Sequence, residues 1–452
     1  MKIQSVKGTR DFYPEQMRMR NWIVDAWRRV SLRNGFEEYD SPIFEYLDLF
    51  TIKSGEEIAE QLFHFTDRGQ RELAIRAEIT PSLARMVNAR IQTLPKPIKW
   101  FSVPRVCRAE RPQKGRLREF FQWNIDVIGA EDVLADAECI LVCIDLLGEL
   151  GLESTDVKVR IGSRPLTMAA IEAAGVPADQ VESVLPALDK RPKVSPDDFK
   201  KICADAGLSA EQVEQICRFQ DCPDVDALAE LCKDTPGAEA YVKDLRDLFD
   251  FLTAMGVADF CTLDLKIVRG LAYYTGIVYE VFDASESLRA VAGGGRYDNL
   301  LEVLGGPKLG ATGFGMGDVV LGILLEEKNK LPSLAQTTDF YVIDNDEQSL
   351  GPVLRIVSSL RKLGWSCDYS LKSQKSNKQL KEALKHGAQA AVFVSSDSAA
   401  VSPDGFTVNL KNLATGQQHP TNFFVTEFLS RPEFKTARTI KNLLAGFGLK
   451  GE

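Results

Sequence analysis

The most chemically suggestive stretch of the sequence is residues 269–276, Arg-Gly-Leu-Ala-Tyr-Tyr-Thr-Gly. Arg269 carries a permanently charged, planar guanidinium that suits a carboxylate or a phosphate. Tyr273 and Tyr274 are adjacent, and neighbouring side chains of a strand point to opposite faces, so one can line a pocket while the other supports it. Taken alone, a solvated arginine on an edge strand explains the stretch about equally well. The stretch therefore predicts a binding wall only in combination with other residues.

A second stretch, residues 105–122, is the densest polar cluster of the chain. Pro112 and Gly115 mark a loop between two expected strands, and cations before, within and after it could hold a polyphosphate from two sides. Phe120, directly after the loop, offers an aromatic face to a base. A solvated basic hairpin is the simpler alternative. Polar residues that recur at strand spacing favour a shared polar sheet face: Gln122, Asn124 and Asp126.

The elements that must position these residues follow from hydrophobic spacing. Residues 15–34 have the pattern of an amphipathic helix, and helices are also expected over residues 80–88 and 132–150. Short strands are expected over residues 37–43, 61–66, 73–76, 98–108 and 119–128. Because no long helix separates most of these strands, they predict an antiparallel sheet.

Helical spacing alone continues from about residue 165 to residue 251. Strand patterns resume over residues 262–268, 273–282, 290–294 and 310–315, and an apolar helix begins near Asp318. The sheet is therefore expected to be interrupted by an all-helical insertion and completed after it.

Beyond Pro332 the pattern changes to a regular alternation of short strands and helices. Strands are expected over residues 340–343, 366–369, 391–394 and 406–410, with helices over residues 350–363 and 377–386. This alternation is typical of a small α/β domain with a largely parallel sheet. Residues 423–449 are expected to be helical in part.

The composition sets outer limits on the function. The chain has 452 residues, of which 44% are apolar and 26% charged, as in ordinary soluble globular proteins, and its length suggests about three domains. No apolar run approaches the length of a membrane span, and the first residues lack a secretory signal, so a cytoplasmic location is expected. The net charge of −9 argues against extensive coating of nucleic acid, although a local basic stripe can still bind a phosphate backbone.

The nine cysteines are scattered and form no Cys-x-x-Cys pair. Neither a disulfide framework nor a zinc site is therefore suggested, and the thiols are expected to be reduced core residues.

Several of these stretches together resemble a known family. Residues 105–122 resemble motif 2 of the class II aminoacyl-tRNA synthetases, and residues 111–116, Arg-Pro-Gln-Lys-Gly-Arg, are similar to the histidyl-tRNA synthetase form of that loop. Residues 35–45 resemble motif 1, a dimer-interface element of the class. Residues 269–276 and residues 293–298, Gly-Gly-Gly-Arg-Tyr-Asp, resemble the two histidine-specific motifs. In combination the motifs are highly specific.

The resemblance covers nearly the whole chain, including the opening residues 7–11. It implies an α+β fold, in which the antiparallel-sheet catalytic domain of a class II synthetase carries a helical insertion and is followed by a small α/β anticodon-binding domain. The implied boundaries are residues 1–164 and 256–331 for the two parts of the catalytic domain, 165–255 for the insertion, 332–430 for the anticodon-binding domain and 431–452 for a C-terminal tail.

The activity implied by the resemblance is the ATP-dependent ligation of L-histidine to histidine tRNA, through a histidyl-adenylate, by a homodimer. ATP is the second substrate, accompanied by Mg²⁺. No covalent protein nucleophile is required, so His64, His386 and His419 are expected to be structural or surface residues.

The resemblance also implies which residues contact histidine. Glu78 can receive the substrate ammonium, while Asp126 and a tyrosine hydroxyl can recognise the two imidazole nitrogens through their opposite donor and acceptor needs. The implied histidine-binding residues are Glu78, Thr80, Arg108, Gln122, Asp126, Arg269, Tyr273 and Tyr274.

For ATP, the resemblance implies that Arg108 holds the α-phosphate and that Arg269 bridges this phosphate and the substrate carboxylate. These two are the implied catalytic residues, since they act on charge that develops during attack. The other implied ATP-binding residues are Glu110 on the adenine side, Arg116 and Arg118 at the outer phosphates, and Phe120 under the base.

For tRNA, Gln113 resembles the position that reads the extra guanosine at the acceptor end of histidine tRNA, with Arg111 and Lys114 beside it. A solvent-exposed loop glutamine is the simpler alternative. The expected anticodon-binding domain also carries a basic stripe, which on its own is most often a solvated face: Lys372, Lys375, Lys378, Lys381 and Lys385.

The sequence departs from the family pattern at three positions. Ala272 replaces the usual aspartate of the first histidine motif, and Asp126 is shorter than the glutamate that some relatives carry. Val320 stands where motif 3 of the class has an arginine that covers the adenine and reaches the γ-phosphate. This chain must therefore supply that cation otherwise, bind ATP less tightly, or not use ATP.

A catalytically inactive paralogue, of the type of the ATP phosphoribosyltransferase regulatory subunit, is the competing hypothesis. That relative has the same catalytic-domain fold but lacks the anticodon-binding domain and the basic motif 2 loop. Because this chain has the sequence patterns of both, an active enzyme is favoured.

Overall fold

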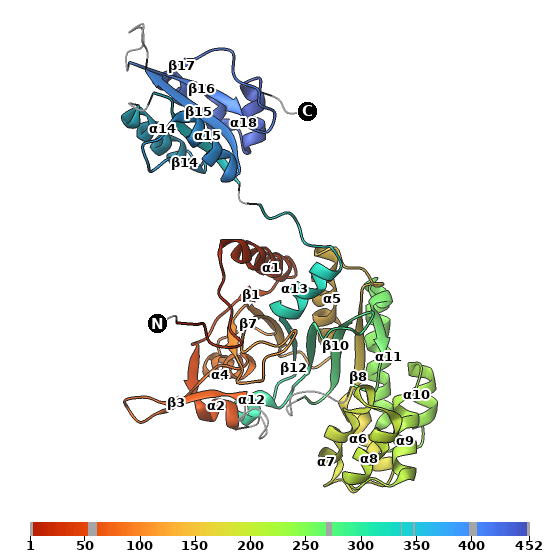
Figure 1. The fold of residues 1–452 in the computed structure, drawn as a ribbon. Coiled ribbons are helices and arrows are strands. Elements are labelled where there is room, and N and C mark those ends of the chain that lie inside the picture. The colour runs from red at the N-terminus through yellow and green to blue at the C-terminus, as the bar shows by residue number, and fades with distance from the viewer. Residues whose placement is uncertain are drawn as a thin grey trace. The chain divides into compact units, whose positions relative to one another are not determined.

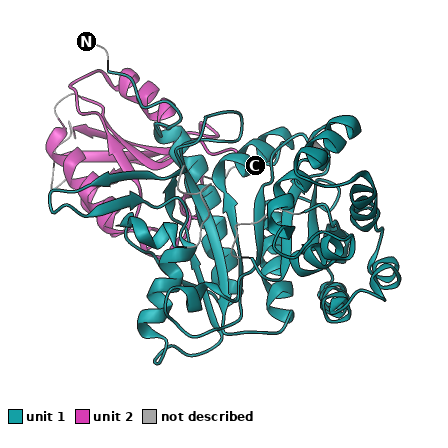
Figure 2. Ribbon diagram, turned by 90° about the horizontal axis from the view of Figure 1, so that it is seen from below, with its two compact units in different colours: residues 1–332 teal, residues 333–452 magenta. Residues whose placement is uncertain are grey.

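The computed structural model describes residues 3–52, 61–267, 274–335, 337–346, 349–396 and 405–449. The chain forms two compact units, Met1–Pro332 and Ser333–Glu452 (Figure 2). Each unit has a separate hydrophobic core. Within the described ranges, every helix is too short or too polar to span a bilayer.

The first unit is built on a nine-stranded sheet in which β1-β5-β7-β12-β11-β10-β8-β9 are neighbours and β6 also pairs with β7. The inner pairs are antiparallel, as predicted, and only β1–β5 and β8–β9 at the two ends are parallel among the described strands. The strands are β1 (Glu37–Glu38), β5 (Ile98–Ser102), β6 (Arg105–Cys107), β7 (Glu119–Ile128), β8 (Val157–Ser163), β9 (Cys261–Leu263), β10 (Ile277–Asp283), β11 (Ala292–Arg296) and β12 (Ala311–Gly317).

Three helices cover one part of this sheet. Helix α1 (Pro14–Arg33) starts with a proline, which is tolerated in the first turn, and is followed by Gly35 at φ +78°. It packs against α5 (Leu134–Glu149), and α13 (Asp318–Glu327) packs against β7. Their apolar faces and the sheet form the largest core of the protein.

A second cluster lies where α4 (Thr80–Arg90) meets α12 (Leu300–Val303). Beside it a small antiparallel sheet, β2-β4-β3, is formed by β2 (Phe44–Tyr46), β3 (Phe63–Thr66) and β4 (Glu72–Ile75), with the short helix α2 (Leu47–Thr51) packed against it. The expected strand over residues 37–43 is wrong in extent, because β1 ends at Glu38 and the next strand begins at Phe44.

The segment between β8 and β9 is helical in all its described regular elements, as the spacing predicts, and Figure 1 shows its helices beside the sheet. They are α6 (Arg164–Ala173), α7 (Val181–Leu188), α8 (Pro196–Asp205), α9 (Ala210–Gln220), α10 (Val225–Cys232) and α11 (Ala238–Ala254), with two short 3₁₀ turns. By compactness this segment is part of the first unit, so the boundaries of residues 165–255 as a domain stay a prediction.

Strand β8 was not expected from the sequence. Its apolar residues Val157, Val159 and Ile161 alternate and are fully buried, and the strand pairs with β10 along its whole length. By contrast, the strand expected over residues 262–268 is short, since β9 ends at Leu263.

The second unit has a five-stranded sheet in the order β14-β13-β15-β16-β17. The prediction of a largely parallel sheet is correct for only half of the strand pairs. Strands β14 and β15 pair with β13 in parallel, whereas β15–β16 and β16–β17 are antiparallel. The connection from Ser396 to Phe406 is too short to make a parallel crossover. The strands are β13 (Thr338–Asp344), β14 (Cys367–Tyr369), β15 (Ala388–Ser396), β16 (Phe406–Asn412) and β17 (Phe423–Phe424).

Helices cover both faces of this sheet. Phe340 and Val342 face a core shared with α14 (Leu350–Lys362), whereas Tyr341 and Ile343 face a core shared with α15 (Ser376–Lys385). Residues 431–452 were expected to form a separate tail, but the structure places most of them within this unit. Helices α16 (Val425–Ser430), α17 (Glu433–Thr436) and α18 (Ile440–Gly446) bury apolar side chains in the same core as α14.

Candidate functional site

The predicted polar face of β7 lies opposite a strand of glycines. In the antiparallel register of β7 and β12, Gly313 is paired with Asp126, and Gly317 with Gln122. A Cβ atom on Gly313 would lie 2.5 Å from Asp126 Oδ1, and one on Gly315 would lie 2.0 Å from Gln122 Nε2. Because such contacts are too short, only glycine lets the two polar side chains lie across β12.

The neighbouring strand β11 is also built from glycines. On the face that carries Asp126, a Cβ atom on Gly295 would lie 3.1 Å from Tyr274 Cδ1, and one on Gly293 would lie 3.7 Å from Glu280 Cγ. The ring of Tyr274 therefore lies directly over the backbone of β11. The two strands form a floor without side chains, bordered by Tyr274 and by the polar groups of β7.

Asp126 is the electrostatic centre of this floor. It is 2% exposed, and its Oδ1 accepts a hydrogen bond of 2.5 Å from the hydroxyl of Tyr297. Its pKa is raised to about 7, mainly by burial and also by the charge of Glu78, while the hydrogen bond from Tyr297 opposes the shift. Asp126 Oδ2 is buried and has no hydrogen-bond partner within the described residues, so it is an acceptor available to a ligand.

Three further predicted residues lie around Asp126. Glu78 is 5% exposed, and Thr80 follows it at the start of α4. The pKa of Tyr274 is raised, first by burial and then by the charges of Glu78 and Asp126. The structure thus brings together an acidic pocket from four separate segments of the chain, with Gln122 at its border.

Arg108 lies between this pocket and the predicted base-binding residue. Its Nε donates a 3.0 Å hydrogen bond to Ala77 O, next to Glu78 in the chain. Its guanidinium carbon lies 5.3 Å from the centroid of the Phe120 ring, and a Cβ on Gly317 would lie 3.8 Å from that ring. Arg108 therefore joins the segment of Glu78 to the ring of Phe120.

The basic loop between β6 and β7 is a tight hairpin. Backbone hydrogen bonds of 3.0 and 2.9 Å join Gln113 and Arg116 in both directions, and Gly115 turns the chain at φ +75°. Arg116 forms a two-pronged ion pair with Glu110, and Arg118 Nε donates to Glu110 O at 3.1 Å. The predicted phosphate-binding and adenine-binding residues are thus paired with each other.

The remaining cations of the loop differ in exposure. Lys114 forms an exposed ion pair with Glu327 at 3.1 Å, and Arg111 is exposed. Such a pair contributes little stability and is easily exchanged for another anion.

The opening residues of the chain lie against this hairpin. Gly8 O accepts a 2.8 Å hydrogen bond from Arg118 N, and a Cβ on Gly8 would lie 2.6 Å from Pro112 Cγ. Arg10 forms a 2.7 Å ion pair with the buried carboxylate of Asp318, which also accepts from Phe121 N. The segment therefore fixes both the loop and the start of α13.

Two residues near Asp126 were not predicted. Tyr297 holds the carboxylate, and the pKa of the buried Tyr39 is raised by burial and then by the charge of Asp126. Tyr297 falls inside the predicted stretch 293–298, which resembles a histidine-specific motif. Tyr39 falls inside residues 35–45, which resemble a dimer-interface motif and gave no indication of a binding role. Arg296 of the same stretch points elsewhere, into a buried ion pair with Asp136 at 2.5 Å.

Some predicted residues lie outside the described part of the chain, namely residues 268–273 with Arg269, Ala272 and Tyr273. His386 Nδ1 lies 3.1 Å from Asp368 Oδ2, and His419 Nδ1 accepts from Thr421 N at 3.1 Å, so both have contacts of their own within the second unit. The five lysines of the basic stripe are exposed.

Neither metal nor disulfide chemistry is evident. In the part of the chain that the structure describes, no group of three or more His, Cys, Asp or Glu side chains is placed to hold a metal ion, and the nine cysteines are free thiols.

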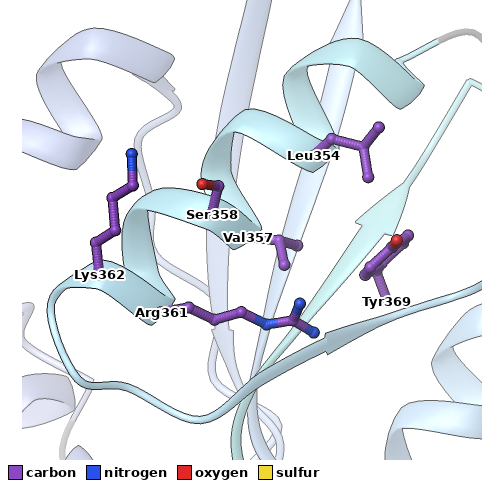
Figure 3. A pocket seen from close by; sticks show the side chains of 6 residues that line it. All are labelled: Leu354, Val357, Ser358, Arg361, Lys362 and Tyr369. Carbon is purple, nitrogen blue, oxygen red and sulfur yellow. The ribbon is translucent and has the colours of Figure 1, made fainter.

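Two cavities lie away from these residues. One of about 470 Å³ is on the second unit between α14 and β14, where Arg361 Nε donates to Cys367 O at 3.0 Å and its guanidinium lies 6.0 Å from the Tyr369 ring. Figure 3 shows the side chains that line it: Leu354, Val357, Ser358, Arg361, Lys362 and Tyr369. No predicted site residue lines this cavity or the second one, of about 560 Å³, beside Arg296 and Asp244.

Comparisons with known proteins indicate the family of the chain. A family model described as histidyl-tRNA synthetase matches residues 8–317. The chain is 40% identical over 416 residues to the histidine–tRNA ligase of Opitutus terrae, covering 91% of this chain and 94% of that protein. It is 39% identical to the chloroplastic/mitochondrial histidine–tRNA ligase of Arabidopsis thaliana, covering 92% and 84%.

Among solved structures, the histidyl-tRNA synthetase from Nostoc sp. PCC 7120 superposes with a TM-score of 0.78 at 24% identity, over 96% of this chain and 99% of that one. This likeness concerns the fold, whereas the family model and the sequence relatives carry the assignment. The chain therefore belongs to the histidyl-tRNA synthetase family.

Proposed function

We propose that the protein ligates L-histidine to histidine tRNA in two steps. The histidine carboxylate attacks the α-phosphate of ATP and releases pyrophosphate, and a terminal ribose hydroxyl of the tRNA then attacks the resulting adenylate and releases AMP. The observation that carries this proposal is the buried carboxylate of Asp126, held by Tyr297 on a glycine floor next to Arg108 and the basic hairpin.

In this proposal, histidine is recognised because its imidazole and its ammonium group each have a different acidic partner in one small pocket. An imidazole N–H donates to the buried Oδ2 of Asp126, and Glu78 receives the substrate ammonium. An apolar amino acid of similar size would leave Asp126 Oδ2 buried without a partner, which costs about 1–3 kcal/mol. Tyr273 and Tyr274, with Thr80 and Gln122, complete the pocket in this proposal.

ATP binding uses the other half of the floor. The adenine stacks on Phe120 with Glu110 at its edge, the α-phosphate is held by Arg108, and the outer phosphates are held by Arg116 and Arg118. Arg269 bridges the α-phosphate and the substrate carboxylate, which reduces their repulsion and stabilises charge that develops during attack. Mg²⁺ enters as the ATP complex, bound chiefly by the phosphates.

For tRNA we propose two contact regions. The hairpin residues Arg111, Gln113 and Lys114 meet the acceptor end, and the exposed lysines of the stripe on and before α15 meet the phosphate backbone near the anticodon. Translation of this kind is expected in the cytoplasm.

A second copy of the chain is proposed to cover the exposed side chains around β2 and β3. Ile43, Phe44 and Tyr46 are between 53% and 60% exposed, and Phe65 is 43% exposed. The rings of Phe44 and Phe65 are in edge contact, with centroids 6.4 Å apart. An exposed apolar patch of this kind is typical of an oligomer interface, in agreement with the resemblance of residues 35–45 to motif 1.

The decisive test is histidine-dependent exchange of labelled pyrophosphate into ATP. We expect exchange that requires histidine and is not supported by leucine at the same concentration, because the leucine side chain has no donor for Asp126 Oδ2. Folded protein without exchange above background would contradict the proposal and favour the inactive regulatory paralogue. Charging of histidine tRNA is the second readout.

A further inference from the structure

One buried polar residue on the site face of β7, Asn124, has no role in the proposed function. The odd-numbered residues from 121 to 127 belong to the main core, so the even-numbered residues of this strand point to the glycine floor. Asn124 lies on that face between Gln122 and Asp126, and two residues span about 7 Å of an antiparallel strand. It is 4% exposed, and a buried amide ordinarily has hydrogen-bond partners.

The oxygen of this amide has none within the described part of the chain. Asn124 Oδ1 and Gln122 Oε1 are both buried without a hydrogen-bond partner there. The cross-strand neighbour of Asn124 on β12 is Gly315, and a Cβ atom on Gly315 would lie 2.0 Å from Gln122 Nε2. The Gln122 amide therefore lies over the glycine that faces Asn124. The two amide oxygens are neighbouring neutral acceptors on one face of the sheet.

Glu78 provides a negative charge at the same place. After burial, the charge of Glu78 raises the pKa of Asp126 and of Tyr274, so its carboxylate lies close to both. An ammonium group has three N–H donors and no acceptor, so it is satisfied by three acceptors. One carboxylate balances its single charge, and two further acceptors are best neutral, because a third carboxylate beside Glu78 and Asp126 would be repelled.

The covalent order of histidine matches the order of these groups along β7. In the proposed function the imidazole lies at Asp126, and the carboxylate lies toward Arg108 and the nucleotide at Phe120, six residues earlier on the same face. The carbon that bears the ammonium lies between imidazole and carboxylate in the amino acid. Asn124 is therefore level with the ammonium.

We propose that Asn124 Oδ1 accepts a hydrogen bond from the substrate ammonium and, together with Glu78 and Gln122, completes its binding site. The inference rests on the proposed function and extends it to a residue outside the histidine-binding set that the resemblance implies. Asn124 is a binding residue, and it favours an α-amino acid over an imidazole compound that lacks the amino group.

The test compares Asn124→Ala and Asn124→Asp with the parent protein and with Asn21→Ala, which changes an exposed asparagine of α1. Calorimetry without ATP gives the Kd of histidine, and exchange kinetics give kcat and KM for both substrates. Inhibition of exchange measures the affinity for imidazolepropionate, in which hydrogen replaces the ammonium.

For Asn124→Ala we expect the Kd and KM of histidine to rise about tenfold or more, since a hydrogen bond to a charged group is lost. The values of kcat, KM for ATP and the affinity for imidazolepropionate should stay within about twofold, because the ammonium is bound equally in the ground state and the transition state. Asn124→Asp keeps an acceptor oxygen in either protonation state and should stay within about threefold of the parent. Asn21→Ala should match the parent.

Three results would overturn the inference. They are unchanged histidine affinity in Asn124→Ala, an equal loss for imidazolepropionate, which would assign Asn124 to the packing of β7 against Ser102 of β5, and an equal loss in Asn124→Asp, which would assign the contact to the amide nitrogen. Failure of the proposed function is a separate result. The parent would then show no histidine-dependent exchange, whereas the calorimetric comparison would still report on Asn124.

Discussion

At the scale of single residues, the proposed specificity for histidine depends on one buried group, Asp126. The sequence predicted the residue from its place in a polar strand and from the family resemblance. It could not predict the hydrogen bond from Tyr297, because the two residues are 171 positions apart and meet only when β7 and β11 enter the same sheet. The electrostatic character of the pocket is thus a property of the fold rather than of any local pattern.

Replacement of Asp126 by asparagine should flatten the pH dependence of stability of the free protein. The folded pKa of about 7 lies above the ordinary value of 3.8, so the contribution of this carboxyl to stability is full below about pH 4 and is lost as the pH rises through 7. Relative to Asp126→Asn, the parent should lose about 3 kcal/mol of unfolding free energy between pH 5 and pH 8. Urea denaturation at several pH values measures this difference.

The control for that experiment is Asp226→Asn, because this carboxylate is 91% exposed on the surface of α10. It should leave the difference between pH 5 and pH 8 unchanged. Parallel pH profiles for the parent and Asp126→Asn would contradict the raised pKa.

At the scale of elements, the two glycine strands leave a face without side chains for the proposed substrate site. Most strands and helices were predicted from spacing, but β8 was missed, since its signal is only seven residues long and precedes a helical segment. The tail was misjudged for a related reason: α17 and α18 are short, and their packing against α14 depends on contacts that no local pattern displays.

A methyl group on the floor should damage both stability and histidine binding. In Gly313→Ala the new Cβ would lie 2.3 Å from Ile125 O, a backbone atom that cannot move away, and 2.5 Å from Asp126 Oδ1. We expect a loss of about 1–3 kcal/mol in unfolding free energy and a raised KM for histidine. Thermal denaturation and exchange kinetics measure the two effects.

Gly322→Ala is the matched control, because it adds the same methyl group within α13 with no atom within 4 Å. It should be neutral or more stable by about 0.5–1 kcal/mol, as alanine favours helix. Equal effects of the two substitutions would show that the floor is not packed as described.

At the scale of the whole molecule, the proposed catalytic site and one of the two proposed tRNA-contact regions lie in units with independent cores. The core of the first unit includes no residue after Pro332, and the large core of the second includes none before it. Composition and the change of pattern near Pro332 were enough to predict this division. They were not enough to predict the mixed sheet of the second unit, because strand direction depends on connections that spacing does not describe.

Residues 1–332 produced alone should keep histidine-dependent exchange within a few-fold of the full chain, since every described residue of the proposed pocket belongs to that unit. Charging of histidine tRNA should fall by about a hundredfold, because one of two linked contact regions is lost. Exchange and charging assays on the same preparations give the comparison. Loss of exchange in a folded fragment would mean that the second unit takes part in adenylation.

In the proposed nucleotide site, the ion pair between Arg116 and Glu110 affects the free energy of phosphate binding. When a phosphate binds Arg116, it displaces the carboxylate of Glu110. The electrostatic attraction gained with the phosphate is therefore reduced by the attraction lost with Glu110, and the local charge changes less than it would at an unpaired arginine. In the proposed site, Glu110 would then compete with the phosphate and would pair with Arg116 again when pyrophosphate leaves. Such an exchange keeps the affinity for polyphosphate moderate and favours release of the product, which suits an enzyme that must turn over.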